Sequence, residues 1–479
     1  MSVARVFRNA SLLVLAQALT TPISIVVNAI AARVLGAKDF GHLYQALTFS
    51  TFVFLFVEWG QPNVLMAKVA THRASAGELL GSGIAFRVCA AVVAGLVVPC
   101  ICIVAGYDRD FIFILSVAML GATFATVAAA CQDVLRGFER TDFAAASYVG
   151  WQLLSAAVVV PTLLLGGGLY GFLIAQVSCA AAGAVFVLKM MPRMRVPHLS
   201  VRGDAVKELV RSGQPFLWFG LVLTLQPLID AAMLSKLAAP EAMGWYAAAR
   251  KLVGVLTYPA SALILALYPT LCRLRAESME SFRTNAAEAL YAVSVAVVPL
   301  ALGCALFPGL GVAIFGQQSY GPAQDDLRVL APYVFLVYFS MPIGSCLASS
   351  GRQNVWTLVQ LGCVLVSLIL DPPLIRWFQE HGGNGGLGVC VAAVISELLM
   401  VIGGLLFLPS GILAKVPRAK LGVVLLSGVV MAAVAAVSTA LDEVLRAVLA
   451  VLAYCACLQV LGGFDFLQVR GFLQGLRGR

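Results

Sequence analysis

The sequence predicts an all-α integral membrane protein with about 14 transmembrane helices. Three observations predict this class: few charged residues, a series of apolar runs of helix length, and an internal repeat. Of 479 residues, 61% are hydrophobic and only 11% are charged, against roughly 25% charged in soluble proteins. So few charges could not cover a soluble surface, because exposed apolar area causes aggregation. The composition therefore excludes a soluble enzyme, a disordered chain and a secreted disulfide scaffold.

The apolar runs have the length that a membrane crossing requires. A bilayer core about 30 Å thick needs about 20 apolar residues per helix, and lipid satisfies no backbone polar group, so the runs are expected to be helical. The long stretch 143–188 is divided by three successive glycines, 166–168, because glycines end a helix at little cost. The runs are 9–32, 40–57, 88–107, 111–132, 143–166, 168–188, 212–229, 252–272, 289–315, 329–351, 353–370, 387–408, 421–441 and 447–464.

The distribution of Lys and Arg predicts the orientation. When the loops alternate across the membrane, 23 of the 32 basic residues, Arg87 among them, fall on the side of the N-terminus. The excess of Lys and Arg on one side marks that side as cytoplasmic. We therefore expect a multi-pass membrane protein with both termini in the cytoplasm. The net charge of +9 then faces an anionic leaflet, and no nucleic-acid partner is expected.

No metal or cofactor is expected. The twelve cysteines lie almost entirely inside apolar runs, where they behave as small hydrophobic side chains. Neither the cysteines nor the four histidines have the spacing of a metal site. The chain also lacks a phosphate-binding GxxxxGK[ST] loop, so ATP is not expected to drive it directly.

Short motifs recur about 200 residues apart in the same order. The matched segments are 33–41 with 236–244, 135–140 with 347–352, and 167–169 with 385–387, at offsets of 203, 212 and 218. In the first pair, a basic residue precedes a glycine by eight positions, and Tyr44 or Tyr246 follows. Six spans separate the halves, so the repeats are parallel, as in transporters whose substrate site lies between the halves. Alternatively, the loops share Gly and Arg for topology alone.

The repeat predicts the domain organisation. It gives two six-helix lobes related by a parallel pseudo-two-fold repeat, plus two C-terminal helices outside the repeat. The predicted divisions are an N-terminal lobe at 1–190, a cytoplasmic linker at 191–208, a C-terminal lobe at 209–410, and helices 13 and 14 with a cytoplasmic tail at 411–479.

The motifs resemble those of the polysaccharide flippases, which belong to the multidrug/oligosaccharidyl-lipid/polysaccharide exporter superfamily. The segments that carry the resemblance are Arg33–Gly41, Leu135–Arg140, Gly244–Leu252 and Ser350–Arg352. The resemblance covers residues 1 to about 465 and identifies the superfamily better than the substrate. It implies two six-helix lobes, alternating access to a central cavity, a location in the bacterial inner membrane, and transfer of undecaprenyl-pyrophosphate-linked glycans from its inner to its outer leaflet.

Basic residues near the outer ends of spans are the candidate ligands of such a head group. A pyrophosphate needs cations that form charge-assisted hydrogen bonds. We therefore predict that Arg33, Lys236, Arg250 and Lys251 bind substrate, together with polar groups inside the first and seventh spans, Gln17, Asn28 and Gln226. The alternative for each cation is that it extends to the lipid interface.

Acidic residues inside spans are the candidates for ion coupling or a polar cavity. They are Glu58, Asp230 and Glu397, the last near the middle of its span. A carboxylate at this depth pairs with a cation, is protonated, or binds a coupling ion. Asp133 and Arg136, three residues apart, are expected to pair on the surface of one helix.

The function predicted from these residues is a lipid-linked oligosaccharide flippase, not an enzyme. Its predicted partners are the lipid-linked glycan, membrane lipid, and a polysaccharide polymerase or glycosyltransferases. One alternative is an ion-coupled multidrug exporter of the same superfamily, in which Glu58 or Glu397 would bind cationic drugs. A second is a membrane glycan polymerase or ligase, which the short loops on the outer side disfavour.

Overall fold

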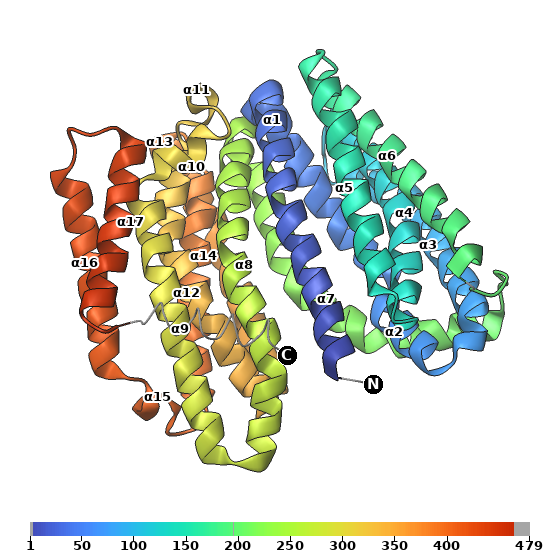
Figure 1. Cartoon of the computed structure of the whole chain (residues 1–479). Helices are drawn as coiled ribbons and strands as arrows, with labels where there is room; N and C mark the ends of the chain where they lie inside the picture. The colour runs from blue at the N-terminus through green and yellow to red at the C-terminus, as the bar shows by residue number, and fades with distance from the viewer. Residues whose placement is uncertain (1–2, 195, 464–479) are drawn as a thin grey trace. The chain divides into compact units, whose positions relative to one another are not determined.

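The computed structural model describes residues 3–194 and 196–463, which form helices and turns without any strand (Figure 1). The predicted all-α class is confirmed. Contacts divide the chain into two compact units, Met1–Ala247 and Ala248–Arg479. The motif-based boundaries at 190 and 209 differ from this division, and the two six-helix lobes stay a prediction.

The N-terminal unit consists of long helices joined by short turns. It contains α1 (Val3–Glu58), α2 (Gln61–Thr71), α3 (Ala76–Val104), α4 (Arg109–Gly137), α5 (Thr141–Leu164), α6 (Gly168–Met190), α7 (Gly203–Leu237) and the start of α8 (Pro240–Glu277). Short 3₁₀ turns lie at Arg73–Ser75 and Pro192–Met194. The predicted linker 191–208 is therefore only partly a loop, because α7 begins at Gly203.

The C-terminal unit has the same character. It contains the rest of α8, then α9 (Met279–Leu306), α10 (Pro308–Ala313), α11 (Gln317–Tyr320), α12 (Ala323–Ser349), α13 (Gln353–Gly382), α14 (Gly386–Phe407), α15 (Ile412–Lys415), α16 (Arg418–Val437) and α17 (Glu443–Val460). The predicted run 289–315 is interrupted at Phe307, where α9 ends and α10 begins with a proline.

Glycines with positive φ separate several helical segments. Gly36 (φ 75°, ψ 173°) breaks α1 between the two runs predicted at 9–32 and 40–57. The predicted break at the three glycines is confirmed, since α5 ends at Leu164, Gly166 has φ 86°, and α6 follows. Glycine adopts these conformations because it has no Cβ to collide with the preceding carbonyl.

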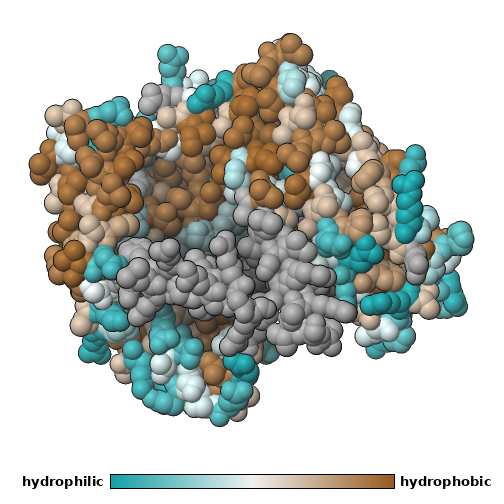
Figure 2. All heavy atoms as spheres, viewed as in Figure 1, coloured by the Kyte–Doolittle hydropathy of each residue, from teal (hydrophilic) through white to brown (hydrophobic). Residues whose placement is uncertain are grey.

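Eleven helices in the described part of the chain are long and apolar enough to cross a membrane. A twelfth span results if the two segments of α7, which are bent by 46°, count together. The predicted number of fourteen is not confirmed, because α1 counts once for two predicted spans and α8 is not among the eleven. Figure 2 shows hydrophobic residues along much of the helices' length and hydrophilic residues near both of their ends.

Each unit has an apolar core near one end of its helices. In the N-terminal unit, buried Leu65, Leu80, Val134 and Leu209 join α2, α3, α4 and α7. In the C-terminal unit, the corresponding cluster joins α8, α9, α12 and α15 through Leu271, Phe282, Cys346, Leu347 and Ile412. The N-terminal core fixes the helix ends that carry the Arg87 network described next.

Candidate functional site

A buried polar network centred on Arg87 connects four helices of the N-terminal unit. The Arg87 side chain is fully buried; its Nε donates to Gln61 Oε1 at 3.1 Å, and its Nη1 donates to the Thr126 carbonyl at 2.8 Å. The Thr126 hydroxyl in turn donates to Glu58 Oε1 at 2.9 Å. Arg87 Nη2 lies 3.9 Å from Asp133 Oδ2. The end of α1, the start of α2, and α3 and α4 therefore share one set of charges.

The network balances two cations against two carboxylates. Asp133 lies between Arg87 and Arg136, whose Nη1 donates to Asp133 Oδ1 at 3.2 Å, and Glu58 completes the set. The predicted Asp133–Arg136 pair is thus confirmed. The assignment of Arg87 to a cytoplasmic loop is wrong, because Arg87 lies inside α3 with no exposed surface.

The first pair of repeat motifs meets in space. A Cβ added at Gly41 would lie 2.8 Å from the Gly244 backbone nitrogen, and the rings of Tyr44 and Tyr246 pack edge to face with centroids 6.2 Å apart. The Tyr246 hydroxyl also donates to Asp230 Oδ2 at 3.0 Å. The predicted site residue Asp230 is therefore a buried acceptor next to the contact between the two motifs.

Lys236 holds the turn that joins α3 to α4. Its Nζ donates to the carbonyls of Ala105 and Gly106 at 2.8 and 2.9 Å, and lies 3.8 Å from the centroid of the Tyr107 ring. These carbonyls lie at the C-terminal end of α3, where the helix dipole favours a cation. Lys236 is thus engaged within its own unit. A phosphate that bound the Lys236 ammonium would have to compete with the carbonyls of Ala105 and Gly106 and with the Tyr107 ring.

The predicted cation and carboxylate of the C-terminal unit lie within electrostatic reach of each other. The guanidinium carbon of Arg250, on α8, lies 4.9 Å from the centroid of the Tyr333 ring on α12. Glu397, on α14, is buried and accepts a hydrogen bond from the Ser340 hydroxyl on α12. Arg250 lies close enough to Glu397 for their opposite charges to interact. Three helices thus contribute to one polar region inside an apolar unit.

The other predicted site residues are more dispersed. Gln17 is exposed on α1, and Asn28 is half-buried and donates to the Ser24 carbonyl at 2.7 Å. Arg33 is exposed three residues before the break at Gly36, and Gln226 and Lys251 are half-buried. The structure does not bring Gln17 and Asn28 into the network around Arg87, and the role of these residues in binding stays a prediction.

The sequence reasoning missed Gln61, Thr126 and Asp326. Asp326, in the first turn of α12, is fully buried; its Oδ1 accepts from Asn384 Nδ2 at 2.9 Å, and its Oδ2 has no partner among the described residues. The sequence did contain a signal for the network. Glu58 and Asp133 each follow an apolar run and Arg87 precedes the run between them, so alternating spans put all three on the same side of the membrane. Residues of opposite charge at the same depth of neighbouring helices favour the formation of one ion-pair network.

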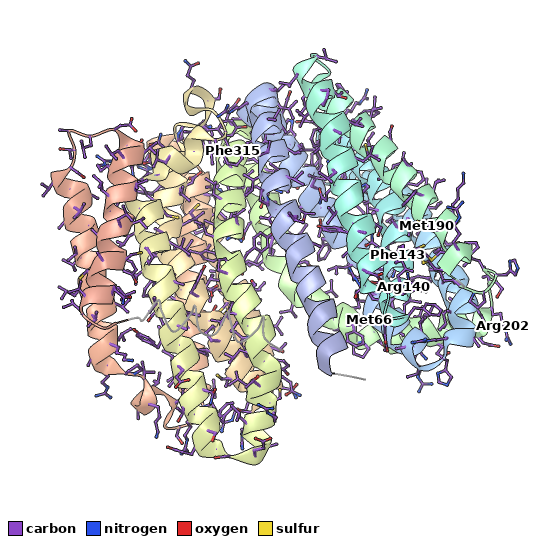
Figure 3. The ribbon with its side chains drawn as sticks, in the orientation of Figure 1. Met66, Arg140, Phe143, Met190, Arg202 and Phe315 are labelled. Atoms are coloured by element: carbon purple, nitrogen blue, oxygen red, sulfur yellow. The ribbon has the colours of Figure 1, made fainter. Side chains whose placement is uncertain are left out.

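Charged side chains at the lower ends of the helices pair locally. Figure 3 labels Arg140 and Phe143 at the lower end of α5, where the Arg140 guanidinium carbon lies 4.4 Å from the Phe143 ring centroid. Arg140 Nε also lies 3.4 Å from Asp142. Among the described residues, no group of three or more His, Cys, Asp or Glu could hold a metal ion.

Solved structures with the same fold are membrane transporters. The lipid II flippase MurJ in an inward closed conformation has a TM-score of 0.73 at 12% identity, covering 94% of this chain and 98% of that one. An inward-facing multidrug resistance MATE family transporter of the MOP superfamily has a TM-score of 0.69 at 15% identity, covering 82% and 95%. A MOP superfamily transporter from Pyrococcus furiosus has a TM-score of 0.57 at 15% identity, covering 84% and 94%.

The family is established from the sequence. No curated protein sequence matches the chain, but the model of a family described as polysaccharide biosynthesis protein matches residues 6–275. That match covers more than half of the 479 residues. The chain therefore belongs to the polysaccharide biosynthesis protein family, and its fold is that of the MOP-superfamily transporters.

Proposed function

We propose that this protein is a flippase that moves an undecaprenyl-pyrophosphate-linked oligosaccharide across a bacterial inner membrane by alternating access. The observation that carries the proposal is the match to the polysaccharide biosynthesis family in a chain made of apolar helices with a transporter fold. A polysaccharide assembled on a lipid must pass its head group through the bilayer, and a transporter fold suits that step better than a hydrolytic site.

The chemistry of the head group supports a cationic ligand set. A pyrophosphate and sugar hydroxyls are rejected by hydrocarbon unless polar groups replace their water. Arg250 and Lys251, half-buried on α8, are our first choice for the phosphates, with Arg33 as a further cation. Lys236 is a weaker candidate than its position in the repeat predicts, because its ammonium already has two carbonyl acceptors.

A carboxylate beside the cation supports ion coupling at the same place. Glu397 shares its polar region with Arg250, so an anionic ligand bound to Arg250 would add negative charge near Glu397 and favour the protonated form of its carboxyl group. Proton uptake by Glu397 would then accompany binding. A ligand shifts the balance between the inward-open and outward-open states only by its differential affinity for them. The direction of transport therefore comes from ion coupling or from removal of the transported glycan lipid on the outer side.

The experiment is reconstitution of purified protein in liposomes with a labelled polyprenyl-pyrophosphate oligosaccharide. Transfer is measured as access of the label to a reagent that does not cross the membrane. Arg250→Gln removes a charged hydrogen bond worth about 1.5–3 kcal/mol, so we expect transfer at subsaturating substrate to fall by at least about tenfold.

The matched control is Arg328→Gln. Arg328 lies in the same unit and loses the same charge, but its side chain is exposed and pairs with Asp325 at 2.7 Å. We expect this variant to transfer at the wild-type rate. If the protein instead moves cationic drugs and not the glycan lipid, the flippase proposal fails and the multidrug alternative replaces it.

Location and partners follow from the same proposal. The excess of basic residues on one side supports cytoplasmic termini. A flipped lipid-linked glycan must be made by glycosyltransferases on that side and consumed by a polymerase or ligase on the other. We propose that this protein itself forms and breaks no glycosidic bond.

A further inference from the structure

The first part of α7, residues 203–218, carries a buried face and an opposite basic face. The buried face is formed by Ala205, Leu209 and Leu217. At the fourth position of this face, a Cβ on Gly213 would lie 2.1 Å from the Trp59 carbonyl oxygen. These positions recur every four residues, so one side of the helix is packed against its own unit without space for a ligand.

The opposite face is exposed and positively charged. At 100° per residue, positions 207, 211, 214 and 218 fall within about 60° of one another around the helix axis. Lys207, Arg211, Gln214 and Trp218 occupy them, all are exposed, and the Trp218 side chain is 61% exposed. Within the described part of the chain, neither Lys207 nor Arg211 has an ion-pair partner.

The acidic residues of this segment do not neutralise the face. Glu208 pairs with Lys68 on α2. Asp204 lies in the first turn of α7, where the positive end of the helix dipole favours a carboxylate. Lys207 and Arg211 are therefore available to an external anion.

The start of α7 is anchored so that this face keeps its direction. The backbone nitrogen of Arg202 donates to Ser82 Oγ at 3.0 Å, and the Arg202 guanidinium lies 3.5 Å from Glu78, both on α3. Figure 3 labels Arg202 at the lower end of this unit, and Figure 1 shows the first part of α7 passing beside α2 at the same level. The basic face thus lies at the end of the helices, not along them.

If Leu237 ends the crossing, helix length puts Trp218 at the opposite membrane boundary. The second segment of α7, Thr224–Leu237, has 14 residues and would span about 21 Å at 1.5 Å per residue. A crossing of about 30 Å needs about 20 residues, and counting twenty back from Leu237 reaches Trp218. The residues before Trp218 then lie outside the hydrocarbon. An aromatic residue at the boundary with basic residues beyond it is typical of a membrane–water interface.

We propose that the Lys207–Arg211–Trp218 face of α7 binds the surface of the membrane leaflet on the side of residues 191–202, through the phosphates of anionic phospholipids. Lys207 and Arg211 bind the phosphates, and the Trp218 ring lies at the level of the glycerol groups. The inference does not depend on which molecule the protein transports. If the proposal is correct, α7 needs anionic lipid at its first part, residues 203–218, to bind the membrane surface.

The depth of Trp218 tests the geometry. In liposomes, the fluorescence assigned to Trp218 is the difference between wild type and Trp218→Phe. Phospholipids brominated close to the glycerol should quench this fluorescence more than phospholipids brominated near the chain end. No quenching by either, or stronger quenching from the chain end, would overturn the proposal.

The charge requirement is tested by hydrogen exchange of residues 203–217 in nanodiscs. Each basic residue near an anionic surface contributes about a factor of five, so adding phosphatidylglycerol to phosphatidylcholine should slow exchange by up to about 25-fold. Lys207→Gln/Arg211→Gln should lose this dependence. The control Lys189→Gln/Arg193→Gln removes two exposed charges of the same unit outside the face and should keep it. Equal lipid dependence in both double variants, or none in wild type, would overturn the proposal.

Discussion

Replacement of Arg87 by glutamine should destabilise the N-terminal unit more than the loss of any exposed charge. Arg87 has no exposed surface, donates to Gln61 and Thr126, and faces Asp133 at 3.9 Å. Arg87→Gln leaves two carboxylates, Glu58 and Asp133, with one partly exposed cation. Removing one partner of a buried pair costs about 3–5 kcal/mol, because the remaining charge stays desolvated.

The size of this effect can be converted into a shift in melting temperature. The unit contains residues 1–247, and for domains of that length 1 kcal/mol corresponds to about 2 °C or slightly more. Arg87→Gln should therefore lower the Tm of the purified protein in nanodiscs by about 6–10 °C. Arg136→Gln, whose side chain is 35% exposed, removes the same charge and should cost about 1 kcal/mol or less.

A double-mutant cycle identifies the electrostatic part of the loss. In the Arg87→Gln background, Asp133→Asn should cost less than in wild type by about 0.5–3 kcal/mol, because the aspartate is then no longer paired with Arg87. A Tm within about 2 °C of wild type for Arg87→Gln, or strictly additive effects of the two changes, would show that Arg87 and Asp133 are not electrostatically coupled.

Two further predictions concern packing and a buried carboxyl group. Gly244→Ala should lower the Tm or prevent folding, because the new Cβ would lie 1.9 Å from the Ala37 carbonyl oxygen, whereas the helical control Gly150→Ala has no atom within 4 Å and should be neutral or slightly stabilising. Asp326→Asn should keep or raise the Tm, because it retains the oxygen that accepts from Asn384 and puts a neutral amide in place of a buried carboxyl group that has no cation beside it among the described residues. A large loss of stability would contradict this expectation.

Local features were predictable from sequence because they depend on neighbours along the chain. The helix break at Gly166 follows from three successive glycines, and the Asp133–Arg136 pair follows from a spacing of three on a helix. The composition likewise sufficed for the class, since a chain with 11% charged residues cannot be soluble.

The networks were not predictable because their members are distant in the sequence. Arg87 looked like a loop residue because it stands just before an apolar run, and its burial depends on the packing of α2 and α4 against α3. Gln61 is 26 residues away and Thr126 39 residues away. The repeat identified Gly41 and Gly244 as equivalent, but equivalence does not imply contact, and only the structure places their backbones together.

Transfer of a lipid-linked glycan by the purified wild-type protein would test the proposed flippase function without any substitution. Liposomes containing a labelled polyprenyl-pyrophosphate oligosaccharide in both leaflets are treated with an impermeant reagent that destroys the label outside. With the protein, we expect nearly all of the label to become accessible, while about half stays protected in liposomes without protein. Protection of half the label in both samples, with active transport of a small cationic drug by the same protein, would contradict it.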